Sequence, residues 1–95
     1  MTGSVQARPE ALDEVLRRSV EHVRRSRLEP GCLLHSVHQD VEDANRVVFV
    51  EHWEDMAALL AHFSVPASGA FVEALRDLAA TAPTLEVYDA VTLEL

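Results

Sequence analysis

Apolar side chains recur at helical spacing in three parts of the chain. The first stripe predicts a helix from about residue 10, with apolar positions at Leu12, Val15, Leu16, Val20 and Val23. Pro30 and Gly31 end this helix. A second stripe predicts a short helix that Pro66 breaks, with apolar positions at Met56, Leu59, Leu60 and Phe63. A further helical segment is expected from about 67 to 80.

Other segments have the composition and alternation of strands. Cys32 to Gln39 and Arg46 to Trp53 flank a polar connection and predict an antiparallel hairpin. Val47 to Val50 are four consecutive apolar residues, so both faces of that strand need cover. The tail from Leu85 to Glu94 alternates and predicts a last strand, and a short opening strand is expected near Thr2 to Ala7.

This order of elements is strand, helix, strand, strand, helix, strand. It predicts an α+β fold of the ferredoxin-like, split β-α-β kind with an antiparallel sheet. Helices cover one face of such a sheet, which leaves the opposite side chains of Val47 to Val50 without cover in a monomer. We therefore expect a homodimer whose sheets pack together into a dimeric α+β barrel.

Composition narrows the class of protein. The 95 residues form one domain, 1–95, and carry a net charge of −8, which disfavours binding to nucleic acid. The longest apolar run, Met56 to Ala61, is too short to cross a membrane, and no secretory signal is visible. We expect a cytoplasmic protein that contacts neither membrane nor nucleic acid. The single cysteine, Cys32, is expected to be a small buried apolar residue.

Several short motifs occur in a characteristic order. They are Leu28-Glu29-Pro30-Gly31-Cys32-Leu33, then Asn45-Arg46, then Glu51-His52-Trp53-Glu54-Asp55, and finally Leu59 and His62. This pattern resembles the antibiotic biosynthesis monooxygenase family of dimeric α+β barrels. The resemblance implies a small homodimeric oxygenase with a pocket between sheet and helices. Members of this family that oxidise polycyclic phenols or quinols use O2 without a metal or a flavin, so the resemblance also implies a reaction without a cofactor.

The chain also departs from two branches of that family. Haem-degrading members have a catalytic Trp at the position of His62 and a haem-ligating His at the position of Val72, so haem degradation is not expected. The quinone-forming, antibiotic-tailoring members have an Asn at the position of Phe49. Other members include an isomerase of a small phosphorylated carbonyl compound, so the family alone does not define the reaction.

The five histidines are the main candidates for chemistry. His35 and His38 are three apart in a strand and point to opposite faces, while the remaining histidines belong to other elements, so no metal site is expected. His22, between arginines, is expected to be solvated. The chain has no nucleophile elbow of the G-x-S-x-G kind and no glycine-rich phosphate loop, which argues against a hydrolase and against nucleotide or flavin binding.

General acid-base chemistry remains, and His62 is the leading candidate for a base because it borders the apolar stripe of its helix. Imidazole can remove a phenolic or carbon-bound proton, and the resulting anion can pass an electron directly to O2. We assign catalytic roles to His62 and, in shaping the pocket, to Trp53. The residues expected to bind substrate are His35, His38, Phe49, Leu59, Phe63 and Tyr88.

Three functions follow from these residues. The first is a cofactor-independent monooxygenase that oxidises a small aromatic phenol or quinol with O2. The second is a non-catalytic module that binds an apolar small molecule or forms a barrel. The third, an isomerase of a small carbonyl substrate, ranks last because Arg46 and Arg76 are the only basic residues beyond residue 30.

Overall fold

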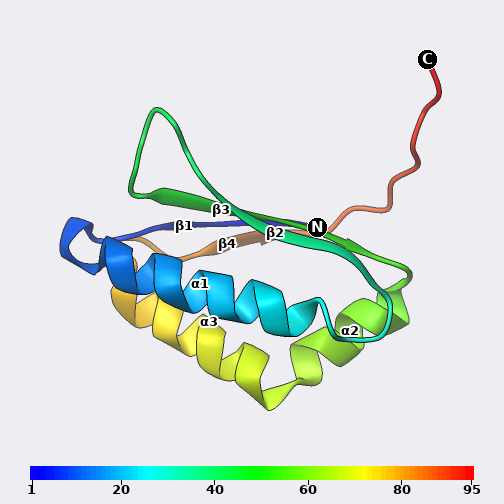
Figure 1. Ribbon diagram of the computed structural model, residues 1–95, viewed down its shortest axis with the longest axis horizontal. Coiled ribbons are helices and arrows are strands. Elements are labelled where there is room, and N and C mark those ends of the chain that lie inside the picture. The colour runs from blue at the N-terminus through cyan, green and yellow to red at the C-terminus, as the bar shows by residue number, and fades with distance from the viewer.

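The computed structural model describes residues 1–95 and contains one antiparallel sheet with helices on one face (Figure 1). The strands are β1 (Thr2–Gln6), β2 (Cys32–Gln39), β3 (Arg46–Trp53) and β4 (Thr84–Glu86), in the order β2-β3-β1-β4. The helices are η1 (Pro9–Ala11), α1 (Leu12–Ser26), α2 (Met56–Ser64) and α3 (Pro66–Leu78). The predicted α+β, ferredoxin-like order of elements is confirmed.

Helix α1 forms where the sequence predicted it because its ends and faces suit a helix. Asp13 and Glu14 lie in its first turn and Arg24 and Arg25 in its last turn, which complements the helix dipole. Its buried face contains small and polar residues as well as valines: Val15, Ser19, His22, Val23 and Ser26. The helix therefore brings a histidine, and not only apolar groups, to the sheet.

Gly31 makes the turn from α1 into β2. Its φ of 80° lies in the left-handed region that favours glycine. A Cβ at this position would lie 2.5 Å from the Cβ of Ala58, so the turn also packs closely on α2. The Pro30-Gly31 pair thus ends the first helix, as predicted, and sets the start of β2.

The two faces of β3 differ in their surroundings. Val47, Phe49 and Glu51 are buried on the face that the helices cover, and Val48 and Val50 are half-buried on the other face. The core beneath the sheet consists of Val5, Ala7, Val15, Val23, Val47, Phe49, Phe71 and Leu75. The helix-free face is where the predicted second copy would pack, and the dimer stays a prediction.

The predicted last strand is longer than the strand that the structure contains. The structure has β4 at Thr84–Glu86 only, and residues 87–95 leave the sheet as an extended tail (Figure 1). The reason is the register: Glu86 pairs with Thr2, so β1 offers almost no backbone beyond that pair. An alternating sequence cannot continue a strand where the neighbouring strand has ended.

No single helix has the length and apolar character needed to span a membrane, and only α2 and α3 taken together, at 71° to each other, meet that criterion.

Candidate active site

A pocket of about 330 Å³ opens between the sheet and the helices. Its walls include three phenylalanine rings, from Phe49 on β3, Phe63 on α2 and Phe71 on α3. Polar groups from three other positions also reach it: His22, Glu51 and His62. The pocket is thus an apolar cavity with a small polar centre, as expected for a site that binds small molecules.

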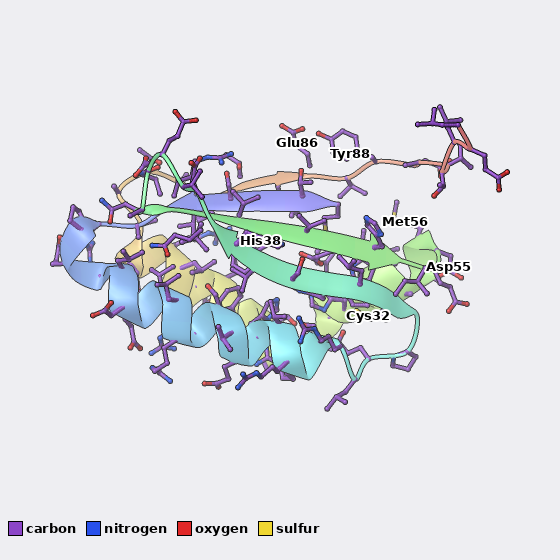
Figure 2. All side chains as sticks on the ribbon, turned by 45° about the horizontal axis from the view of Figure 1, so that its top comes forward. Cys32, His38, Asp55, Met56, Glu86 and Tyr88 are labelled. Atoms are coloured by element: carbon purple, nitrogen blue, oxygen red, sulfur yellow. The ribbon has the colours of Figure 1, made fainter.

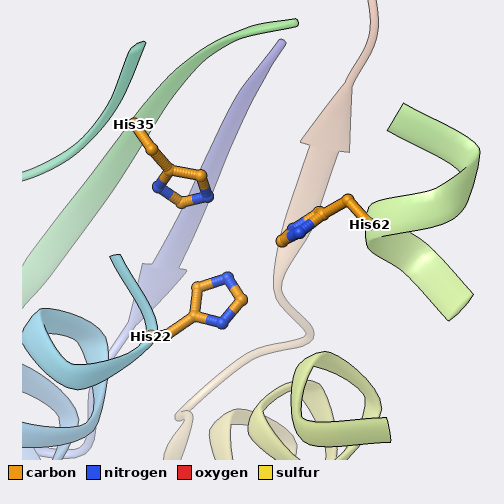
Figure 3. Close-up of side chains that lie close together, drawn as sticks. All are labelled: His22, His35 and His62. Carbon is orange, nitrogen blue, oxygen red and sulfur yellow. The ribbon is translucent and has the colours of Figure 1, made fainter. Parts of the chain in front are cut away.

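Three histidines from three elements meet at this polar centre (Figure 3). His22 comes from α1, His35 from β2 and His62 from α2, and only 5%, 2% and 3% of each residue is exposed. Their ring centroids lie 5.2 to 5.6 Å apart. Such deep burial of three titratable rings side by side is uncommon and marks the place where chemistry is expected.

Two carboxylates hold these rings. Glu29, in the turn before β2, places Oε1 2.9 Å from Nδ1 of His62. Because an ionised carboxylate can only accept, Nδ1 of His62 carries the proton of this hydrogen bond. Nε2 of a neutral His62 ring therefore keeps its lone pair, on the side of the ring nearer to Glu51.

Glu51 is the second carboxylate, and its side chain is only 4% exposed. Its Oε1 accepts a hydrogen bond of 2.9 Å from the indole Nε1 of Trp53 and lies 3.2 Å from Nε2 of His35 and 3.9 Å from Nε2 of His62. Burial raises the pKa of the Glu51 carboxyl, but the neighbouring His35, Trp53 and His62 lower it by more. Its pKa thus lies below the ordinary value and the group is ionised at neutral pH.

His22 is a neutral ring in this cluster. Burial, which is the largest cause, and the nearby basic groups of His35, His62 and Arg25 together lower its pKa to about 3. The guanidinium of Arg25 donates to Nδ1 of His22 across 2.7 Å, so the ring proton resides on Nε2. The ring also stacks on Phe71, with centroids 4.1 Å apart and an angle of 8° between the planes.

His35 differs from the other two rings because neither of its nitrogens has a hydrogen bond. Its side chain is completely buried, and the contact with Glu51 has the distance of an ion pair but not the alignment of a hydrogen bond. Buried polar groups normally find a partner, and Nδ1 of His35 has none, so this ring at the centre of a polar cluster points to a group that it binds.

The structure places most of the predicted site residues near this centre. Phe49, His62 and Phe63 line the pocket, His35 lies in the cluster, and the Trp53 ring lies 4.6 Å from that of His62. Leu59 is buried on α2 without lining the pocket.

Two predicted substrate-binding residues lie elsewhere. His38 is on the helix-free face of the sheet, where its Nε2 is hydrogen-bonded to Ser36, and Tyr88 is exposed in the tail next to Glu86 (Figure 2). Neither contributes to the pocket. The reason for His38 is strand alternation, which turns it away from the face that His35 occupies, and for Tyr88 it is the early end of β4.

Sequence reasoning missed three residues of the site. His22 was expected to be solvated but is buried, because its position in α1 continues the stripe of Val15 and Ser19. Glu29 and Glu51 belong to the motifs quoted above, but no role was assigned to them. A signal for Glu51 existed, since it follows Val47 and Phe49 at strand period on the covered face.

Comparison with known proteins agrees with this fold. Residues 1–74 match the family model described as antibiotic biosynthesis monooxygenase. Protein sll1783 from Synechocystis sp. is 33% identical over 88 residues, which is 93% of this chain and 60% of that protein. The chain thus spans about three fifths of the length of this relative.

Solved structures show the same similarity. A crystal structure of an antibiotic biosynthesis monooxygenase is 32% identical, with a TM-score of 0.88 and 96% of each chain covered. Protein PA3566 from Pseudomonas aeruginosa is 26% identical, with a TM-score of 0.83 and coverage of 95% of this chain and 91% of that one. The chain belongs to the antibiotic biosynthesis monooxygenase family, and the resemblance seen in its motifs is confirmed.

Proposed function

We propose that the protein is a cofactor-independent monooxygenase that oxidises a small aromatic phenol or quinol with O2. The observation that carries this proposal is the hydrogen bond between Nδ1 of His62 and Glu29, which makes Nε2 the ring nitrogen that can accept a substrate proton in a pocket with aromatic walls. Membership of the monooxygenase family supports the class of reaction.

In the proposed reaction His62 removes a proton from the substrate, and Glu29 stabilises the imidazolium that forms. The substrate anion then transfers an electron to O2, so that the substrate itself is the reductant. For a methylene carbon of an anthrone-like phenol, one oxygen atom becomes the carbonyl oxygen, and the other leaves as water with the two hydrogens of that carbon. Phe49, Phe63 and Phe71 supply an apolar wall against which an aromatic substrate ring can pack.

Trp53 has a positioning role in this proposal. Its indole does not line the pocket, but it donates to Glu51 and packs beside the His62 ring. Replacing Trp53 with Phe keeps an aromatic ring and removes the N–H. We expect this variant to change the pH dependence of turnover through Glu51 and His62, with less effect on substrate affinity.

Oxygen uptake with a panel of quinols and anthrone-like phenols tests the proposal. We expect His62→Ala to reduce uptake by about 10²-fold or more, which is a typical contribution of an acid-base group. Glu29→Gln is expected to reduce uptake as well, because the imidazolium of His62 loses its carboxylate partner. His52→Ala is the matched control, because His52 lies on the opposite face of β3 and does not line the pocket. Equal rates for the native protein and His62→Ala would refute the role of this residue, and tight binding without turnover would favour the non-catalytic module.

One observation favours the isomerase as a second candidate. Arg76 lines the pocket and could bind a phosphate group of a small carbonyl substrate. Competition between such phosphorylated compounds and quinols, and its loss in Arg76→Gln, would identify this activity.

We also propose that the protein is a homodimer through the helix-free face of the sheet. Val48 and Val50 of β3 lie there without a covering layer, next to Leu34 of β2, which is 40% exposed. Light scattering is expected to give twice the mass of one chain, and Val50→Glu to give one chain mass. A native monomer at micromolar concentration would refute this interface. The cytoplasmic location and a single domain over 1–95 stay predictions.

A further inference from the structure

The three buried histidines and Glu51 have the donor atoms of a transition-metal site. One ring nitrogen from each of His22, His35 and His62 can be chosen so that all three lie within 4.8 Å of one another. Zinc-nitrogen bonds of about 2.0–2.1 Å in a tetrahedron place the donors about 3.4 Å apart, so the rings have to approach by roughly 1 Å. Figure 3 shows the three rings around one common space.

Glu51 completes this set. Its Oε1 lies 3.2 Å from Nε2 of His35 and 3.9 Å from Nε2 of His62, which brackets the spacing of two ligands on one ion. The carboxylate is buried and carries the negative charge that a divalent cation needs in an apolar surrounding. The indole N–H of Trp53 holds the same oxygen and so orients the carboxylate.

Two further features point to a ligand at this place. The ring of His35 is fully buried, and its polar contact within the protein is the 3.2 Å approach of Nε2 to Glu51, which is itself one of the four proposed ligands, so an ion between them keeps both groups partnered. The carboxylate of Glu29 accepts a hydrogen bond from Nδ1 of His62 and leaves Nε2 as the nitrogen that can bind a metal. This is the carboxylate-histidine arrangement that commonly orients a metal ligand.

We propose that His22, His35, His62 and Glu51 bind one divalent transition-metal ion of the class that prefers imidazole, such as Zn²⁺, Co²⁺, Ni²⁺ or Cu²⁺. Mg²⁺ and Ca²⁺, which prefer an all-oxygen environment, do not bind there. The inference does not rest on the proposed oxygenase activity. An ion on Nε2 of His62 takes the lone pair that would accept the substrate proton, so loading with Zn²⁺ inhibits the cofactor-independent reaction.

Arg25 opposes metal binding in the conformation seen here. Its guanidinium donates to Nδ1 of His22, which keeps the proton of that ring on Nε2. Binding through Nε2 moves this proton to Nδ1 and turns the half-buried Arg25 side chain away from the ring. Arg25 also places a positive charge close to the ion. Removing this arginine therefore strengthens the site, which is an effect that a merely structural role of the histidines would not produce.

Titration of chelator-treated protein with Co²⁺ at pH 7.5 tests the inference, with visible absorption and calorimetry as readouts. We expect one Co²⁺ per chain, a visible d-d spectrum and displacement by Zn²⁺, with no heat from Mg²⁺ or Ca²⁺. His22→Gln and His35→Gln lose the spectrum, and Glu29→Gln weakens the affinity by about 10–100-fold. Arg25→Met binds Co²⁺ several-fold more tightly.

His38→Gln and His52→Gln are the matched controls, because both side chains lie on the opposite face of the sheet from the three buried rings. They are expected to keep the full Co²⁺ spectrum, and circular dichroism verifies the fold of every variant. Absence of a spectrum in the native protein, an unchanged spectrum in a folded His35→Gln, or loss of the spectrum in either control would overturn the inference. Oxygen uptake by metal-free protein is measured separately, so the two proposals fail independently.

Discussion

The buried neutral ring of His22 predicts how the stability of the protein depends on pH. Burial and the neighbouring basic groups hold its pKa at about 3, whereas the same side chain in the unfolded chain has a pKa of 6.5. Between these two values the unfolded chain binds one proton more than the folded protein. The free energy of unfolding therefore falls as the pH decreases from about 6.5 toward 3, by up to about 1.4 kcal/mol per pH unit.

The expected size of this effect is large enough to measure. With these two pKa values, lowering the pH from 7 to 5 removes about 2 kcal/mol of stability through His22 alone. The free energy of unfolding of a whole domain is only about 5–15 kcal/mol. Above pH 7 the ring is neutral in both states, so this contribution no longer changes with pH.

Urea unfolding at half-unit steps from pH 7 to pH 5 measures the effect, with native protein and His22→Phe compared at each step. Phenylalanine keeps a ring against Phe71 and cannot bind a proton. We expect the difference in the free energy of unfolding between the two proteins to shift by about 2 kcal/mol across this range. A parallel pH dependence of the two proteins would refute the assignment of a depressed pKa to His22. His38→Phe, on the helix-free face of the sheet and away from the pocket, is the control and should keep the pH dependence that His22→Phe removes.

Three further changes test the packing. Phe71→Ala should lower the free energy of unfolding by about 3–5 kcal/mol, because it opens a cavity beneath the sheet, and a loss below about 1 kcal/mol would contradict the packing of this ring. Gly31→Ala should lower the free energy of unfolding by more than about 1 kcal/mol, because Gly31 has a φ of 80° and the new Cβ would meet Ala58. An unchanged thermal midpoint would show that the turn adapts. Deletion of residues 88–95 should change the stability of one subunit by less than about 0.5 kcal/mol, because the tail is exposed, and a larger loss would reveal packing of the tail.

The strands show where sequence patterns succeed and where they stop. The bounds of β2 and β3 agree with the predicted Cys32–Gln39 and Arg46–Trp53, because polar and glycine-containing segments mark both ends of each strand. The tail had an equally regular alternation, yet only Thr84–Glu86 is a strand. Alternation describes one strand alone, whereas a strand requires a neighbour for its backbone groups, and β1 is too short to provide one.

The site shows the same division between local and distant information. Alternation along β2 correctly placed His35 and His38 on opposite faces, and the position of His62 at the edge of an apolar stripe correctly marked it for the pocket. The sequence alone also determined the family, through motifs at the turns and strand ends. Local spacing is sufficient for these features because they depend on the period of a single element.

The meeting of His22, His35 and His62 was decided only by the tertiary structure. The three residues are separated by 13 and 27 positions in the chain and become neighbours because α1 and α2 pack on the same face of the sheet. Their protonation and partners depend on that packing, since desolvation and the charges of Glu29, Glu51 and Arg25 act only at short distance. The pattern of one element determines which way a side chain points, and the docking of elements determines what it meets.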